Sequence, residues 1–207
     1  MPYSRRDHVV LCDRRSRPCS VHRRYAVIDV ETTGFDPRSD RIVEIGCAIV
    51  DGARVVATWS TLVDPQRPIP PRVTRVHGIA DAHVAGAPLF DVAVGQLAGW
   101  CERAIPVAHN AAFDRGFLPT LHDRAWLCTV ALARRAFPQA PNHRNQTLRR
   151  YLGIELAGAH GPLVAHRALD DALVTAQILI RCLEREALGR AIARQHERCL
   201  ELGLDAA

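Results

Sequence analysis

The sequence YAVIDVETTG, residues 25–34, joins a strand-like apolar run to two acidic side chains. Its β-branched residues predict a buried strand, and Asp29 and Glu31 stand at the end of that strand. Because side chains alternate across a strand, both carboxylates point to the same face. Two like charges about 4 Å apart repel by about 4 kcal/mol at an effective dielectric of 20. The strand end therefore requires a partner that offsets this repulsion.

Composition indicates one domain in a reducing compartment. The chain has 207 residues, 48% of them hydrophobic, which is enough for one core. No apolar run approaches the roughly 18 residues that span a membrane, and residues 9–12 are too short for a secretory signal. Seven scattered cysteines favour free thiols over a disulfide framework. We expect a cytoplasmic protein with no membrane partner and an unknown oligomeric state.

The positive charge is concentrated at the N-terminus. The net charge is +5, and residues 1–24 hold seven arginines against two aspartates, so the remainder is balanced. We predict a basic, flexible arm over residues 1–24. This arm either adds salt-dependent affinity for phosphate backbones or is dispensable. Its Cys12, Cys19 and His22 fit no common zinc spacing and lack a fourth ligand.

Alternating strand and helix patterns predict a mixed α/β sheet. Asp51-Gly52 signals a hairpin, and the prolines between residues 65 and 71 indicate an extended loop. The expected strands are 25–30, 41–50, 54–63 and 105–108; the expected helices are 89–102, 111–122, 128–137, 146–152 and 167–188, with residues 189 to about 202 extending the last helix.

A second segment with candidate site residues leads from a strand end into a helix. His109 and Asn110 follow the short strand, and Asp114 falls in the first turn of the next helix. Taken alone, Asp114 is typical of an acid that complements the helix dipole, and His109 is typical of a core histidine. The functional interpretation therefore depends on what the other segments bring to the same place.

A third segment, His166 to Asp171, contains a choice between two aspartates. In one continuous helix His166 and Asp171 would lie about 140° apart, so His166 must lie at or before the helix start to face the same site. Asp170 shares its helix face with amide and charged side chains, which is a solvent face. Asp171 shares its face with threonine, isoleucine and cysteine. Asp171 is therefore the predicted site residue.

Together, the three segments supply four carboxylates and a histidine. Four converging carboxylates repel one another unless cations lie between them, and oxygen ligands suit either Mg²⁺ or Mn²⁺. Two such ions can stabilise both the attacking and the leaving oxygen of a phosphodiester. A histidine can remove the proton from the attacking water.

Three ordered motifs resemble the DEDDh family of 3′→5′ exonucleases, which includes the proofreading epsilon subunit of bacterial DNA polymerase III. They are DVETTG at 29–34, AHNAAFD at 108–114 and HRALDDA at 166–172, and VHGI at 76–79 matches a further family signature. The resemblance covers residues 25–185 and implies a ribonuclease H-like fold, a five-stranded mixed sheet flanked by helices. Residues 186–207 would form a short helical tail.

The resemblance implies a role for each motif residue. Asp29 would bridge two divalent ions, Glu31 and Asp171 would complete the first ion's shell, and Asp114 would hold the second. His166 would be the general base. The expected contacts to the 3′-terminal nucleotide involve Thr32, Thr33, Gly34, His109 and Asn110. One departure is Cys128, where family members often have aspartate, and we treat it as tolerated because the position is not catalytic.

The resemblance implies cleavage that releases nucleoside 5′-monophosphates from single-stranded 3′ ends of DNA or RNA. The sequence leaves the preferred sugar open, and a DNA polymerase remains a candidate partner. The short C-terminal segment carries no recognisable clamp-binding peptide, which favours a stand-alone or accessory nuclease. The alternative is a non-catalytic nucleic-acid-binding adaptor on an exonuclease fold.

Overall fold

A computed structural model describes residues 24–156 and 164–201. Almost all of the predicted basic arm, including its cysteines and histidine, lies outside the described residues. Within the described part of the chain, no helix is long and apolar enough to cross a membrane.

The described strands form one five-stranded sheet, which confirms the predicted mixed α/β architecture. Its order is β3-β2-β1-β4-β5, in which the β3–β2 and β2–β1 pairs are antiparallel and the β1–β4 and β4–β5 pairs are parallel. The strands are β1 (Arg24–Thr32), β2 (Ile42–Asp51), β3 (Arg54–Leu62), β4 (Ala104–Ala108) and β5 (Leu127–Cys128).

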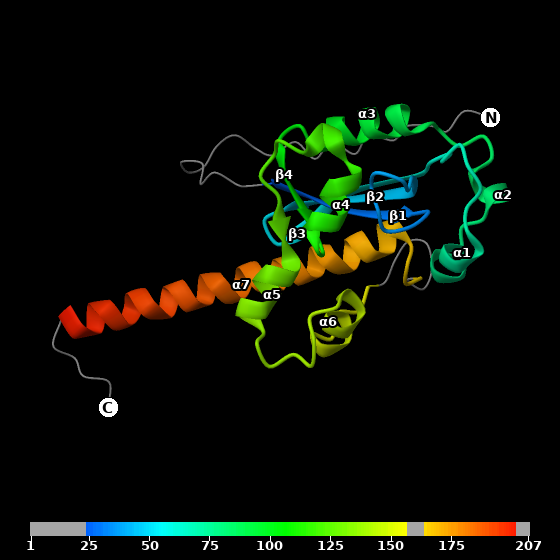
Figure 1. The fold of residues 1–207 in the computed structure, drawn as a ribbon. Helices are drawn as coiled ribbons and strands as arrows, with labels where there is room; N and C mark the ends of the chain where they lie inside the picture. Colours follow the sequence, from blue (N-terminus) through cyan, green and yellow to red (C-terminus); the bar gives the residue numbers. More distant parts are fainter. Residues whose placement is uncertain (1–23, 157–163, 202–207) are drawn as a thin grey trace.

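Helices cover both faces of this sheet (Figure 1). Ile28 and its neighbours pack against α3 (Phe90–Cys101), α4 (Ala111–Phe117) and the short 3₁₀ helix η1 (Pro119–Leu121). Val27, on the opposite face of β1, packs with apolar residues of the long helix α7 (Ala168–Glu201). Because β2 is covered on both sides, it reads as a continuous apolar run rather than an alternating one.

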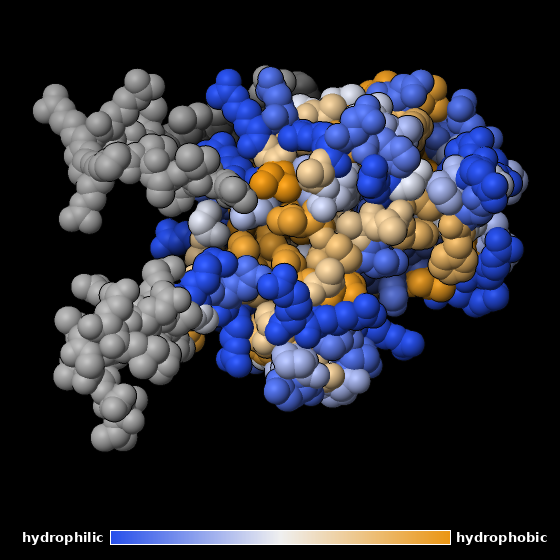
Figure 2. All heavy atoms as spheres, turned by 60° about the vertical axis from the view of Figure 1, so that its left-hand side comes forward, coloured by the Kyte–Doolittle hydropathy of each residue, from blue (hydrophilic) through white to orange (hydrophobic). Residues whose placement is uncertain are grey.

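A second layer of helices lies on α7. α5 (Thr129–Ala136) and α6 (Asn145–Tyr151) bury a separate apolar cluster against the middle of α7. Arg134, Arg135 and Arg150 are exposed on these two helices. Figure 2 shows hydrophilic side chains (blue) in the lower part of the molecule. α7 continues through Glu201, as the sequence predicts for the segment after residue 188.

Two regions differ from the sequence predictions. The helix predicted over 111–122 ends at Phe117, because Pro119 disfavours a helical conformation at Leu118, which has φ −117° and ψ 70°. The predicted extended loop is present up to Pro70, but the sequence analysis did not predict the two helices that follow it, α1 (Pro71–His77) and α2 (Asp81–Val84). Pro71 stands at the first position of α1, where a missing N–H costs nothing.

Candidate active site

The floor of the candidate site is the end of β1. Asp29 pairs with Gly46 and Glu31 pairs with Glu44 on β2, so all four residues belong to the face that α7 covers. A register shift follows directly after Glu31. This irregularity ends the regular ladder and turns the chain into the TTG segment.

The TTG segment uses its side chains to hold its own shape. The Thr32 hydroxyl donates to the Gly34 carbonyl (2.6 Å), and the Thr33 hydroxyl donates to Asp40 (3.1 Å). A Cβ on Gly34 would lie 2.4 Å from the Asp40 carboxylate, so any larger residue here would have to displace the Asp40 side chain that Thr33 and Asp36 hold. Both hydroxyl protons are therefore used within the protein, although each oxygen can still accept a hydrogen bond.

α4 brings the second motif to the site. Asn110 adopts a left-handed conformation (φ 68°) directly before the helix, and this turn sends Asp114 back toward β1. Asp114 is only 2% exposed. Burial raises the pKa of Asp114 to about 7, although backbone N–H groups of Asp114 and Val30 act in the opposite direction. The Asn110 side chain is exposed, which leaves its amide accessible to a ligand.

His109 occupies a structural position. Its Nε2 lies 2.9 Å from the His143 carbonyl, which can only accept, so Nε2 carries the proton. Its Nδ1 then accepts from the Thr129 hydroxyl at 2.8 Å. Burial lowers the pKa of His109 and so favours this neutral form. Both ring nitrogens are therefore used inside the protein, and the side chain anchors the loop before α6 instead of offering a nitrogen to substrate.

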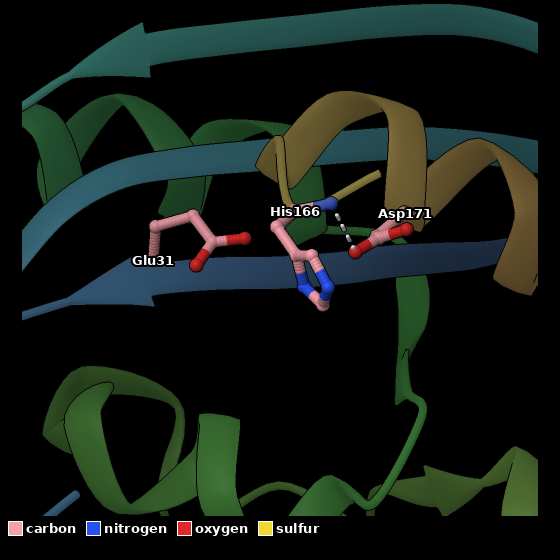
Figure 3. A group of neighbouring side chains, drawn as sticks. All are labelled: Glu31, His166 and Asp171. Carbon is pink, nitrogen blue, oxygen red and sulfur yellow. Dashed lines mark hydrogen bonds between the residues drawn. The ribbon is translucent and has the colours of Figure 1, made fainter. Parts of the chain in front are cut away.

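The start of α7 completes the cluster. His166 has a left-handed backbone (φ 62°) and lies just before the helix, where the sequence required it to be. Its backbone N–H donates to Asp171 Oδ2 (3.1 Å), and the carboxylates of Glu31 and Asp171 point toward His166 from either side (Figure 3). Potential ligand atoms of these three residues all lie within 4.8 Å of one another. Asp171 is 8% exposed, whereas Asp170 accepts the Val164 N–H at the surface.

Two polar residues that the sequence analysis did not single out support this cluster. Gln146 of α6 donates to Asp171 Oδ1 (2.7 Å), and Asn145 donates to the Asp171 carbonyl (3.2 Å). The Gln146 bond orients the Asp171 carboxylate, and the Asn145 bond ties α6 to the backbone of α7. Two amide side chains at the start of a short helix carry no sequence signal for this role.

A third supporting residue, Glu44, lies within β2, where the apolar sequence pattern predicted only a buried strand. Glu44 is 4% exposed and accepts hydrogen bonds from Arg167 and from the backbone N–H of Ala168 (2.9 Å). Two residues further along β2, a Cβ on Gly46 would lie 2.3 Å from the α7 backbone. β2 therefore receives the start of α7 directly and holds the loop that carries His166.

An exposed aromatic side chain borders the site. Phe35 follows the TTG turn, is 82% exposed, and lies with its ring centroid 6.4 Å from that of Phe113. Phe113 in turn contacts Phe117 in the core. Its place beside the TTG turn, and not its exposure alone, makes the Phe35 ring a candidate contact for a planar ligand.

The electrostatics of the cluster favour cations. Burial, then the charges of Asp114 and Asp171, raise the pKa of Asp29 well above its ordinary value. Burial, then Asp171 and Glu44, raise the pKa of Glu31 to about 8. Burial also raises the pKa of Asp171. These carboxylates are hard oxygen donors whose shared ionisation is unfavourable without positive charge, so the donor set fits divalent metal ions such as Mg²⁺ or Mn²⁺.

The comparisons with known proteins agree with this geometry. A family model described as exonuclease matches residues 26–179, which is most of the chain. A DNA polymerase III of the PolC type from Clostridium perfringens is 36% identical over 163 residues, which cover 75% of this chain. The chain belongs to the exonuclease family.

Two further matches place this exonuclease more closely. A DNA polymerase III subunit epsilon-like protein from Rhodobacter capsulatus is 38% identical over 169 residues, covering 77% of this chain. The structure of Exonuclease X in complex with 5′ overhanging duplex DNA is 36% identical, with a TM-score of 0.69 over 77% of this chain and 91% of that chain. These matches confirm the DEDDh, DnaQ-like resemblance, the 3′→5′ exonuclease class and the ribonuclease H-like fold.

This exonuclease spans only a small part of the polymerase relatives. The matched region is 11% of the PolC-type protein and 23% of the epsilon-like protein. Exonucleases of this family use divalent metal ions, in agreement with the acidic cluster around Glu31 and Asp171.

The family position at which this exonuclease has cysteine is also explained by the structure. Cys128 directly precedes α5. Burial acts to raise the pKa of its thiol, but backbone N–H groups at the starts of α4 and α5 outweigh burial and lower it. A position that favours the anionic form of its side chain would suit a carboxylate as well.

Proposed function

We propose that this chain hydrolyses the 3′-terminal phosphodiester of DNA and releases nucleoside 5′-monophosphates by a two-metal-ion mechanism. The observation that carries the proposal is the convergence of Glu31, Asp171 and His166 at the start of α7, above Asp29 on β1. Asp114 adds a fourth carboxylate, because its charge is the largest charge acting on Asp29.

The four carboxylates would hold the ions. Asp29, Glu31 and Asp171 would bind one ion, and Asp29 and Asp114 the other. Divalent ions bound there supply charge neutralisation and stabilise the attacking and leaving oxygens of an in-line displacement. The repulsion between Asp29 and Glu31 that the sequence implies is then offset by the ions.

His166 would act as general base. Its backbone is held by Asp171 while its side chain is exposed, so the imidazole is accessible to solvent beside the carboxylates. It would take a proton from the attacking water as the new P–O bond forms and the bond to the 3′ oxygen of the shortened strand breaks. The shortened strand leaves with a 3′ hydroxyl.

The terminal nucleotide would bind between the TTG turn and α4. The exposed Asn110 amide offers hydrogen bonds, and the exposed Phe35 ring offers a face on which a base can stack. DNA is proposed as the substrate because Exonuclease X, whose structure contains duplex DNA, is 36% identical to this chain. Single-stranded 3′ ends would enter without the cost of unpairing.

The relatives also suggest a biological role for this exonuclease. The PolC-type and epsilon-like relatives support a proofreading role beside a DNA polymerase, in which this chain would act as a stand-alone or accessory nuclease. The adaptor alternative would require a site that no longer holds ions, whereas all five motif residues are present.

A gel time course with 5′-labelled single-stranded DNA and RNA of the same sequence tests the proposal, in Mg²⁺ and separately in Mn²⁺. We expect a ladder that shortens from the 3′ end, faster for DNA. Asp171→Ala should abolish it, whereas the matched neighbour Asp170→Ala should retain it. Cleavage retained by Asp171→Ala would contradict the assignment of Asp171 to the site, and no cleavage by the wild type in either metal would support the adaptor instead.

A further inference from the structure

A basic groove borders the candidate site on the side of α5 and α6. It has a volume of about 390 Å³, and its lining includes Asn110, Arg134, Asn142 and Arg144. We call it the arginine groove. Both arginine side chains are exposed, as are Asn110 and Asn142.

Both walls of the arginine groove are attached to the catalytic cluster. One wall contains Asn110, which directly precedes α4 and its Asp114. The other wall is the loop before α6, which His109 holds through the His143 carbonyl (2.9 Å) and which leads into Gln146, bonded to Asp171. The groove is therefore lined by segments that also position Asp114 and Asp171.

The charge of this region is unusual for the chain. Residues 129–156 contain five arginines and a single acidic residue, Glu155, although residues 25–207 as a whole are balanced. None of the five arginines takes part in an ion pair with the carboxylates of residues 24–156 and 164–190. Exposed guanidinium groups without carboxylate partners are suited to phosphate oxygens.

We propose that the arginine groove binds the backbone phosphates of the strand being cut, on the 5′ side of its two terminal nucleotides. The proposal rests on the proposed exonuclease function, because it takes the 3′ end to lie at the carboxylate cluster. The strand must leave that cluster across a neighbouring surface, and the phosphates repel any acidic one. The arginine groove is lined by the residue before α4 and by the loop before α6, the two elements that carry Asp114 and Gln146, and it carries the opposite charge.

The double variant Arg134→Gln/Arg144→Gln tests the proposal. Binding of a single-stranded oligonucleotide of about twelve nucleotides is measured by fluorescence anisotropy in Ca²⁺ over a range of salt concentrations. Each phosphate contact to a single strand contributes about 0.7 to the slope of log K against log salt, so the slope should fall by about 1.4 and Kd should rise roughly tenfold. This readout does not depend on cleavage, so it separates failure of the groove from failure of the proposed activity.

A second readout uses cleavage. The ratio of kcat/KM for the long oligonucleotide to that for a dinucleotide should fall about tenfold in the double variant, because only the long strand reaches the groove. Arg54→Gln/Arg103→Gln is the matched control, since both arginines are exposed and lie at the opposite end of the sheet, beside the start of β1.

The proposal would be overturned by an unchanged salt slope, by an equal loss of affinity in the control variant, or by an equal loss of kcat/KM on the dinucleotide. A defect seen only with duplex substrate would also overturn it, because the groove would then hold the complementary strand.

Discussion

Arg167 and Glu44 form an ion pair that joins the start of α7 to the middle strand pair of the sheet, although they are 123 residues apart. The Arg167 Nη2 lies 2.6 Å from Glu44 Oε1, and its Nε lies 3.0 Å from Oε2. Glu44 also accepts the Ala168 N–H, so one buried carboxylate binds both the Arg167 side chain and the first backbone N–H of α7. The Arg167 guanidinium also opposes, in part, the rise that the Glu44 charge causes in the pKa of Glu31.

Replacing Glu44 should therefore impair the placement of His166. We expect Glu44→Gln to lower kcat roughly 10- to 100-fold with little change in KM, because small displacements of catalytic groups have effects of that size. Asp51→Asn is the control, since it breaks the exposed Arg24–Asp51 pair at the other end of β2 and should leave kcat unchanged. Equal kinetics for Glu44→Gln and wild type would contradict a positioning role.

Gly46 should be intolerant of any side chain. A Cβ added to Gly46 would lie 2.3 Å from the backbone of α7. Neither β2 nor α7 can move to make room without separating Asp29 from Asp171. Gly46→Ala should reduce the free energy of unfolding by at least about 2 kcal/mol, measured by urea denaturation.

A glycine with free space around it provides the comparison for Gly46. Gly95 lies on the exposed side of α3, and nothing would meet a Cβ there. Gly95→Ala should therefore stabilise the protein by about 0.5–1 kcal/mol. Similar unfolding curves for the two variants would show that α7 is not held against β2.

The carboxylate cluster should make stability without metal depend on pH. The pKa of Glu31 is raised to about 8, so the folded state holds a proton that the unfolded state loses near pH 4.5. Stability is then lost as pH rises toward and through 8. In EDTA, we expect Tm to fall by on the order of 5 °C between pH 7 and pH 9.

The choice of this pH window separates the carboxylates from the buried histidines. Burial lowers the pKa of His77 and His109, and their contribution to stability changes only below their ordinary value of 6.5. Glu31→Gln should flatten the Tm profile above pH 7, and Mg²⁺ or Mn²⁺ should raise Tm more at pH 8.5 than at pH 6.5. A wild-type Tm that rises between pH 7 and pH 9 in EDTA would show that the pKa of Glu31 is not raised in the folded protein.

Removing the imidazole of His166 should slow the chemical step. We expect His166→Ala to lower kcat by about 10²- to 10⁴-fold, the usual contribution of general base catalysis, while oligonucleotide binding changes little. Single-turnover kinetics with saturating enzyme measure this step directly. Retention of more than half of the wild-type rate would remove His166 from the mechanism.

Phe35 should contribute to substrate binding without contributing to stability. Its ring is 82% exposed, and stacking of a base on an aromatic ring is worth about 1–3 kcal/mol. Phe35→Ala should therefore raise KM by roughly 5- to 100-fold at nearly constant Tm. Leu188→Ala, another exposed apolar residue but on the distal part of α7, serves as the control and should leave KM unchanged.

Short-range patterns in the sequence were enough to place Asp29, Glu31, His166 and Asp171 within their elements, whereas the motif resemblance added Asp114, His109 and Asn110. The period of two places Asp29 and Glu31 on one face of β1, and the register with β2 agrees. The period of 3.6 distinguishes the buried Asp171 from Asp170 and requires His166 to precede the helix. Each of these inferences depends only on residues within one turn or one strand, so local backbone geometry decides them.

The remaining features depend on contacts between distant segments. β5 is only two residues long, too short for any periodicity, and it exists because β4 provides a partner. In the sequence, Glu44 is one position of an apolar strand, and its role depends on the start of α7, which donates to it. Gly46 is needed because the backbone of the same helix lies where its side chain would be. His109 reads as a substrate contact until the loop before α6 occupies its ring nitrogens.

What the chain's sequence determined by itself was therefore the strand, the helix starts and the acidic side chains that they carry, because these follow from repeats of two and 3.6 residues. The tertiary structure decided which polar groups support the acids, since β2, α6 and α7 meet only after the sheet has formed. Hydrogen bonds across 25 to 124 residues of sequence leave no local pattern, because their partners are chosen by topology.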